Sequence, residues 1–252
     1  MTVNVILQAR MTSSRLPGKV MMDLCGAPML TRQIERIRRA RFINRIIVAT
    51  SEGVEDTPVA LLAQHLGVDC FRGSLKDVLG RFCHAAMEYS SDHVMRLTGD
   101  CPLADPGLID DLIAFHLEGG YDISSLGIER TFPHGLDAEV MTFAALQSAG
   151  AAACSAHDRE HVTPYLYARP ELFRVGSMRQ ARDESHLRWT VDYPEDMEVV
   201  RRIFAHFLEV KPDFTWTDVK AFLKAAPHVQ ALNAGRCTVP GHSTHAVDGV
   251  FR

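Results

Sequence analysis

Residues 3–19 read VNVILQARMTSSRLPGK and contain the feature that decides the fold. The apolar run Val3–Leu7 is typical of a buried strand. It leads directly into a loop that holds three cations, Arg10, Arg15 and Lys19, together with a proline and a glycine. A strand that ends in a basic loop rich in backbone N–H groups suits an anionic ligand at the end of a parallel sheet.

The order of strand and helix repeats through the first half of the chain. Short apolar runs predict further strands at residues 46–49, 68–71, 94–97 and 121–124. Apolar residues at helical spacing predict a helix after each of the first four strands, and Asp77 is a good cap for the third helix. Such alternation predicts an α/β fold whose mostly parallel mixed sheet carries helices on both faces.

The pattern is looser after Thr131. Further strands are predicted at residues 138–142, 173–177 and 187–191, with a long polar connection at 155–170, and helices at 194–209 and 216–225. We predict one domain, residues 1–232, followed by a flexible or partner-docked tail, residues 233–252. Cys237, His242 and His245 in this tail are interpreted as an incidental grouping, not a metal site.

Composition narrows the classes of function. The 252 residues are 46% hydrophobic and 23% charged with a net charge of -4, which argues against a general nucleic-acid surface. The first residues do not resemble a signal peptide, and no apolar stretch approaches the ~20 residues that span a bilayer. The six cysteines are scattered without a C-x-x-C pair. We therefore expect reduced thiols in a cytoplasmic protein that does not bind nucleic acid and is not inserted in a membrane.

Polar or charged loops follow each of the first four predicted strands. These loops carry the following residues: Gln8, Ala9, Arg10, Ser14, Arg15, Gly18 and Lys19; Thr50 and Ser51; Arg72, Gly73 and Ser74; Thr98, Gly99 and Asp100. Because parallel strands end at one edge of a sheet, the four loops are expected to converge there. Their convergence predicts a ligand site more strongly than any single loop does.

Two common phosphate-binding motifs are excluded. A Walker A loop needs a glycine five residues before the Gly-Lys pair and a Ser or Thr after it, but Ser13 and Val20 occupy these places. No G-x-G-x-x-G follows a strand either. A polyphosphate-binding loop of another kind remains the hypothesis, and a solvated basic loop is the alternative.

Two aspartates are candidate metal ligands. Asp100 follows the predicted strand at 94–97, and Asp192 ends the stretch HLRWTVD. A divalent cation held by Asp100 and bridging phosphate oxygens would account for both signs of charge, since the phosphates would pair with the basic loop and the cation with the carboxylate. Alternatively, Asp100 is a turn residue before Pro102.

Seven segments together resemble one known family. They read LQARMTSSRLPGKVM, IIVATS, FRGSLKDVLGRF, RLTGDCPLADP, TFPHGLDAEV, REHVTPYLY and LRWTVDYPEDMEVVRRI, and they span roughly residues 3 to 207 in order. This set is similar to the SpsF-like cytidylyltransferases, which are related to the CMP-sugar acid synthetases. The resemblance implies a Rossmann-like, GT-A-type nucleotidyltransferase fold.

The resemblance also implies roles for individual residues. Arg10, Arg15 and Lys19 would contact the triphosphate, with Lys19, Arg15 and Asp100 in catalytic roles, and Asp100 and Asp192 would bind Mg²⁺. The nucleotide would further contact the other loop residues given above and Asp77. The acceptor would contact His134, Asp137, Glu139, Arg159, His161 and Arg188. Tyr193 stands where the related V-D-x-P-E-D motif commonly has threonine.

The implied reaction is transfer of a nucleotide from CTP to an anionic sugar or similar acceptor, with release of pyrophosphate. A homodimer is a further expectation from the related synthetases. Two alternatives stay open: a GT-A glycosyltransferase, whose D-x-D metal motif is missing because Cys101 and Pro102 follow Asp100, and a non-catalytic nucleotide-binding protein.

Overall fold

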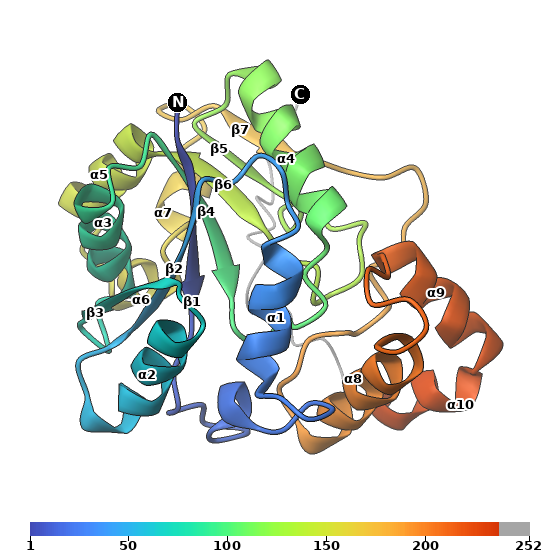
Figure 1. The fold of residues 1–252 in the computed structure, drawn as a ribbon. Coiled ribbons are helices and arrows are strands. Elements are labelled where there is room, and N and C mark those ends of the chain that lie inside the picture. The colour runs from blue at the N-terminus through green and yellow to red at the C-terminus, as the bar shows by residue number, and fades with distance from the viewer. Residues whose placement is uncertain (237–252) are drawn as a thin grey trace.

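A computed structural model describes residues 1–236 (Figure 1), and within this range one mixed sheet forms the centre of the molecule. Its strands are β1 (Val3–Gln8), β2 (Arg45–Ser51), β3 (Asp69–Gly73), β4 (His93–Thr98), β5 (Ile123–Ser125), β6 (Glu139–Thr142) and β7 (Val175–Ser177). Their order is β3-β2-β1-β4-β6-β5-β7. β1 to β4 are parallel, whereas β6 is antiparallel to both β4 and β5. The predicted mostly parallel mixed sheet is confirmed.

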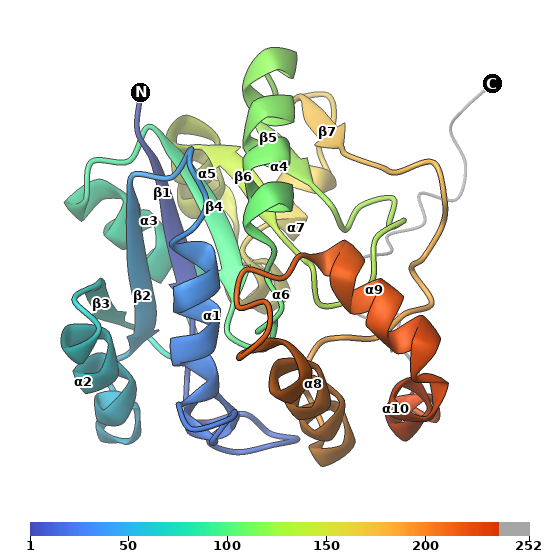
Figure 2. The same ribbon diagram turned by 45° about the vertical axis from the view of Figure 1, so that its right-hand side comes forward.

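Helices cover both faces of this sheet (Figures 1 and 2). They are α1 (Met29–Ile37), α2 (Thr57–His65), α3 (Val78–Glu88), α4 (Pro106–Gly119), α5 (Phe143–Ala152), α6 (Ala156–His161), α7 (Pro164–Tyr167), α8 (Pro194–Phe207), α9 (Trp216–Ala225) and α10 (Pro227–Gln230). Short 3₁₀ turns form at Lys19–Met21 (η1), Val54–Asp56 (η2) and Ala231–Asn233 (η3). Helices α1, α4 and α8 pack on one face, and α3, α5 and α7 pack on the other.

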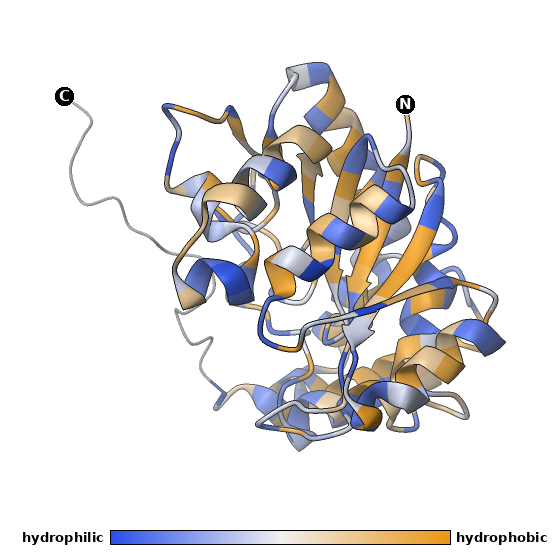
Figure 3. Cartoon of the chain, turned by 90° about the vertical axis from the view of Figure 1, so that its left-hand side faces the viewer, coloured by the Kyte–Doolittle hydropathy of each residue, from blue (hydrophilic) through white to orange (hydrophobic). Residues whose placement is uncertain are grey.

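The strand sequences explain why both faces are covered. Along β1, Val5 and Leu7 lie in the core under α1, whereas Ile6 lies in the core under α3. A strand whose successive side chains are buried on opposite faces must be apolar throughout. The central strands are accordingly mostly orange in Figure 3, whereas the surrounding helices mix orange and blue.

One predicted strand is wrong. Residues 187–191 form no strand in the described part of the chain, and pairing is limited to a single bridge between His134 and Arg188. Their backbone is divided between two partners, because Trp189 N–H donates to His134 O whereas Val191 N–H donates to Asp100 O at 2.8 Å. Divided pairing prevents a continuous ladder but places residue 192 beside the loop after β4.

The predicted polar connection at residues 155–170 is also wrong in part, because it contains α6 and α7. Ser155 caps α6 by accepting a hydrogen bond from Asp158 N–H at 3.0 Å, and Pro164 begins α7. Both are ordinary helix-start signals in a polar sequence. α5 precedes them and is capped by Thr142, whose hydroxyl accepts from Ala145 N–H.

The start of the predicted tail is ordered within the described range. Asn233 lies in η3 and is 4% exposed. Cys237, His242 and His245 lie outside the described residues, so the interpretation of that grouping stays a prediction, as does the domain boundary at residue 232. None of the helices in the described range combines the length and apolarity that a bilayer crossing requires.

A buried histidine, His116, predicts a pH-dependent stability. His116 Nε2 lies 3.1 Å from His93 Nδ1, and His116 Nδ1 lies 3.0 Å from Ser124 Oγ. Burial, reinforced by His93 and opposed by Asp122, lowers the pKa of His116 from 6.5 to about 4. As the pH drops, the unfolded chain therefore takes up the proton before the folded chain does. Stability falls as the pH drops from 6.5 to about 4.

We expect the free energy of unfolding to fall by about 2 kcal/mol between about pH 7 and pH 5. Chemical denaturation at a series of pH values measures it. The variant His116→Gln should lose most of this dependence, and an unchanged slope in the variant would contradict the assignment to His116.

Candidate active site

The loops after β1, β2, β3 and β4 meet at one edge of the sheet, as expected from parallel strands. Gln8 is in register with Ala49 on one side and with Thr98 on the other, and Thr50 is in register with Arg72. In Figures 1 and 2 the loop between β1 and α1 runs along the lower edge of the molecule. The segment that leads into α8 lies at the same edge, because Asp192 contacts this loop.

Lys19 stands at the centre of the site. Its Nζ donates to Val191 O at 2.7 Å and to Asp192 Oδ1 at 3.0 Å, and lies 3.4 Å from Asp100 Oδ2. The Lys19 side chain is only 9% exposed. Gly18 has a φ of 74°, which turns the chain into η1 and so brings Lys19 to this position. One ammonium group therefore joins the two predicted metal carboxylates.

Arg15 adds a second cation on the solvent side. Its Nη2 lies 2.7 Å from Asp192 Oδ1, and its guanidinium lies 5.6 Å from the centre of the Tyr193 ring. The Arg15 side chain remains 44% exposed. Arg10 and Ser14 lie in the same loop, half-buried and exposed respectively.

All groups of this cluster are charged at neutral pH. Burial alone raises the pKa of the Asp192 carboxyl, but Lys19 and Arg15 outweigh burial and hold this pKa well below its usual range. The same balance between burial and Lys19 lowers the pKa of Asp100. Burial lowers the pKa of the Lys19 ammonium, yet the two carboxylates raise it by more. Mutual pairing thus stabilises the ionised forms.

The two aspartates are oriented by their neighbours. Thr98 Oγ1 donates to Asp100 Oδ1 at 2.5 Å. Arg188 Nη2 donates to Asp192 Oδ2 at 3.2 Å and also pairs with Asp196. Each carboxylate therefore keeps one oxygen toward Lys19 while its other oxygen is held from behind.

The carboxylate oxygens of Asp100 and Asp192 are suitable ligands for a hard divalent cation. Asp100 and Asp192 each point one carboxylate oxygen at the same positive group, within 3.4 Å. Within residues 1–236 there is no group of three or more His, Cys, Asp or Glu residues arranged to hold a metal. A site with one or two carboxylates, completed by water and phosphate oxygens, is the arrangement that Mg²⁺ prefers over all-protein cages.

Several predicted nucleotide-binding side chains have structural partners. Arg72 donates to the carbonyls of Ser51, Glu52 and Gly53 and so holds the loop after β2. The Ser51 hydroxyl donates to Asp56. Gln8 Oε1 and Thr50 Oγ1, by contrast, are buried without a hydrogen-bond partner. Gln8 and Thr50 are thus the better candidates for contact with a polar ligand.

The loop after β3 is tied to α3. Ser74 Oγ accepts from Asp77 N–H at 3.1 Å, and Asp77 caps α3 by accepting from Gly80 N–H at 2.9 Å. Asp77 also pairs with Arg159, which was predicted to bind the acceptor. Arg159 therefore lies beside a residue that was predicted to contact the nucleotide, not the acceptor.

Sequence reasoning missed Arg81 in α3. This arginine is 2% exposed, and its Nη1 donates to Ser74 O at 2.6 Å. Its Nε and Nη2 are buried without a partner in the described structure. Burial, together with Arg10, lowers the pKa of Arg81 to about 10. In the sequence Arg81 follows a glycine within a helical pattern. Nothing in that context indicates a buried arginine with unpartnered N–H groups.

The remaining acceptor-side predictions separate into two groups. His134, Asp137 and Arg188 lie together, because His134 Nε2 is 3.9 Å from Asp137 Oδ2 and His134 Nδ1 is 3.5 Å from Arg188 Nη1. Asp137 also pairs with Arg130. Burial lowers the pKa of His134, so this histidine is neutral at neutral pH.

Glu139 belongs to a second group. Its carboxylate accepts from Arg96 Nη1 at 2.5 Å, from Thr163 Oγ1 at 3.0 Å and from the Tyr167 hydroxyl. With these partners Glu139 anchors α7 to the sheet. His161 lies at the end of α6, with its ring 4.6 Å from that of His157.

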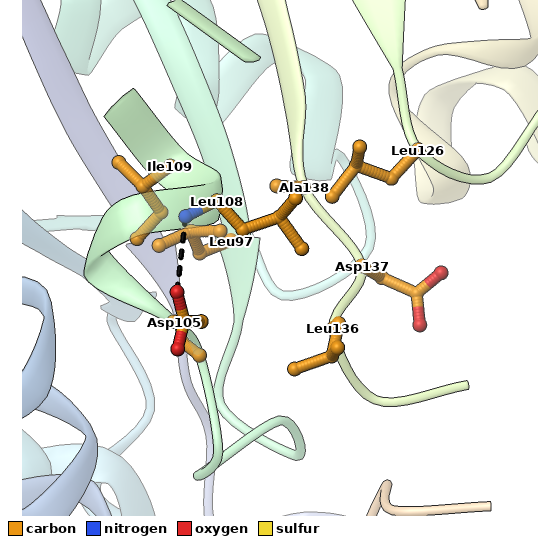
Figure 4. Close-up of a pocket in the computed structure, with 9 residues that line it drawn as sticks. Leu97, Asp105, Leu108, Ile109, Leu126, Leu136, Asp137 and Ala138 are labelled. Carbon is orange, nitrogen blue, oxygen red and sulfur yellow. Dashed lines mark hydrogen bonds between the residues drawn. The ribbon is translucent and has the colours of Figure 1, made fainter. Parts of the chain in front are cut away.

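A small cavity beside this region does not provide a ligand pocket. It lies between β4, α4 and the segment Leu136–Ala138 and has a volume of about 10 Å³, which is room for about one water (Figure 4). In Figure 4 the carboxylate of Asp137 points away from the apolar side chains around the cavity. The candidate site is accordingly the open edge of the sheet.

Comparisons with known proteins identify the family and the fold. A family model described as Cytidylyltransferase matches residues 4–211. A solved cytidylyltransferase structure from Leptospira borgpetersenii has a TM-score of 0.87 and 32% identity, covering 91% of this chain and 96% of that chain. The spore coat polysaccharide biosynthesis protein SpsF of Bacillus subtilis is 31% identical, over 88% of this chain and 94% of that protein.

A third relative is a 3-deoxy-manno-octulosonate cytidylyltransferase from Anaeromyxobacter, 28% identical over 81% of this chain and 97% of its own length. The nucleotidyltransferase fold expected from the sequence is therefore confirmed. The chain belongs to the cytidylyltransferase family as an SpsF-like member, and is thus a nucleotidyltransferase.

Proposed function

We propose that this protein transfers a cytidylyl group from CTP to a sugar acid or related anionic acceptor, releasing pyrophosphate, and that it uses Mg²⁺. The product would be a CMP-conjugate for polysaccharide or glycoconjugate synthesis. Support for the nucleotide comes from the family model and the relatives named above. A cytoplasmic location and a homodimer stay predictions from the sequence.

One observation carries the proposal. Lys19 Nζ lies within 3.4 Å of both Asp100 and Asp192, at the edge where the loops after four parallel strands meet. Arg15 pairs with the same Asp192. A site that combines two acidic and two basic groups within a few ångströms suits a metal-bound triphosphate, which presents both signs of charge.

In the proposed reaction an acceptor oxygen bonds to the α-phosphorus while the bond to the bridging oxygen breaks and pyrophosphate leaves. Such transfer needs alignment and charge neutralisation more than a protein nucleophile. Asp100 and Asp192 would hold the divalent cation, which when bound neutralises charge on the phosphate oxygens. Lys19 and Arg15 would neutralise the leaving pyrophosphate.

The acceptor is proposed to lie toward His134 and Asp137. Neutral His134 can hydrogen-bond an acceptor hydroxyl, and Arg130 and Arg188 are the nearby cations for a carboxylate. A sugar acid is also the kind of acceptor in the name of the Anaeromyxobacter relative. A glycosyltransferase is disfavoured because Pro102 stands where a D-x-D motif beginning at Asp100 would have its second acidic ligand.

Pyrophosphate release tests the proposal. The purified protein is incubated with Mg²⁺, each of the four nucleoside triphosphates, and a panel of 2-keto sugar acids and sugar phosphates. We expect release with CTP and a sugar acid, and tight binding of CTP in calorimetry only when Mg²⁺ is present. Absence of binding for every triphosphate, or cleavage of nucleotide-sugars in their place, would overturn it.

A further inference from the structure

Asp196 lies in the first turn of α8, behind the site, and its carboxylate hydrogen-bonds to residues that border the site. Its carboxylate is completely buried. Oδ1 accepts from Arg188 Nε at 2.9 Å, and Oδ2 accepts from Arg188 Nη2 at 2.8 Å and from Asp192 N–H at 2.9 Å. A buried carboxylate with so many donors fixes the groups that surround it.

Asn233 completes this network from the far end of the described chain. Its Nδ2 donates to Asp196 Oδ1 at 2.9 Å and to Arg188 O at 3.1 Å. Its side chain belongs to η3, which packs against α8. Asn233 therefore contacts both members of the Arg188–Asp196 pair without touching the site itself.

The network holds both the side chain and the backbone of Asp192, whose carboxylate faces Lys19. Arg188 donates to Asp192 Oδ2, and Asp196 holds the backbone N–H of the same residue. Oδ1 of Asp192 is left to Lys19 and Arg15 at the site edge. A shift of Arg188 would consequently turn the Asp192 carboxylate away from the position it needs.

Helix capping alone does not explain Asn233. Asp218 occupies the third position of α9 as Asp196 does in α8, and it caps α9 by accepting from Thr215 N–H at 2.8 Å. Asp218 caps α9 with Lys211 and Thr215 as its partners and without an asparagine. The two donors of Asn233 instead meet the pair that orients Asp192, which is the pattern of outer partners around a ligand.

We propose that Asn233 is a positioning residue for the Asp192 carboxylate, acting through Asp196 and Arg188. The segment after α10 then forms part of the functional site. The inference rests on the proposed function for the identity of the ion that Asp192 holds.

Affinity for Mn²⁺ in the presence of CTP tests the inference, measured by electron paramagnetic resonance of the free ion. We expect Asn233→Ala to weaken Mn²⁺ binding about 10-fold, the lower end of the usual effect of losing an outer partner. Asn233→Ser, which keeps one donor, should fall between the two proteins. It also provides a folded variant if alanine is not tolerated.

Asn4→Ala is the matched control. Asn4 is 1% exposed, and its Nδ2 also makes two hydrogen bonds, to Tyr89 O and Ser91 Oγ, in β1 away from the site loops. Its loss should lower the melting temperature and leave the Mn²⁺ affinity unchanged. Equal Mn²⁺ affinity in wild type and Asn233→Ala, or an equal loss in Asn4→Ala, would overturn the inference alone. No Mn²⁺-dependent CTP binding by the wild-type protein would overturn the proposed function as well.

Discussion

Asparagine in place of Asp100 is expected to slow pyrophosphate release from CTP by about 10³-fold. The substitution keeps the shape of the side chain but removes the charge that holds a cation. The fold should survive, because Lys19 keeps Asp192 Oδ1 at 3.0 Å and Val191 O at 2.7 Å as partners. Steady-state assays with a coupled pyrophosphate readout measure the loss.

Asp110→Asn is the matched control for this result. Asp110 is another buried aspartate, but it accepts from the backbone N–H groups of Arg41 and Phe42, away from the site. This control should lower stability and leave turnover within a small factor of wild type. Wild-type turnover in Asp100→Asn would remove Asp100 from the proposed mechanism.

Gly135→Ala is expected to lower the free energy of unfolding by about 4 kcal/mol. The φ of this glycine is +113°, a conformation that residues with a side chain rarely adopt. A Cβ atom would also lie 2.4 Å from Thr190 N and 2.5 Å from the carbonyl carbon of Trp189. Because this backbone leads into Asp192, metal-dependent CTP binding should weaken together with stability.

Gly26→Ala separates the two causes. Gly26 has a φ of +83°, but nothing lies within 4 Å of the Cβ position. Only the conformational cost applies there, about 1 kcal/mol. Equal losses of stability in the two variants, measured by chemical denaturation, would show that the close approach to residues 189 and 190 has no effect.

Much of the fold follows from local sequence. β1 to β4 are predicted because each is an apolar run between helical patterns, and a parallel sheet then brings their loops to one edge. Lys19 and Asp100 are among the charged residues of these loops, and the structure places them 3.4 Å apart.

Other parts depend on contacts that no local pattern encodes. Residues 187–191 alternate like a strand, but whether they pair continuously is decided by distant partners at His134 and Asp100. Asp196 has the ordinary features of a helix start, so its sequence context does not reveal that it binds Arg188. Glu139 is predicted to bind the acceptor, yet its oxygens are engaged by Arg96, Thr163 and Tyr167.

The hydrogen bond between Lys19 and Val191 joins residues 172 positions apart. During synthesis, β1 and its basic loop emerge from the ribosome long before the partners that neutralise Lys19. A nascent chain that ends before residue 192 would leave Arg15 without its carboxylate partner and Lys19 with Asp100 alone. The site therefore reaches its charge balance only after Asp192 has been translated and α8 folds onto the sheet.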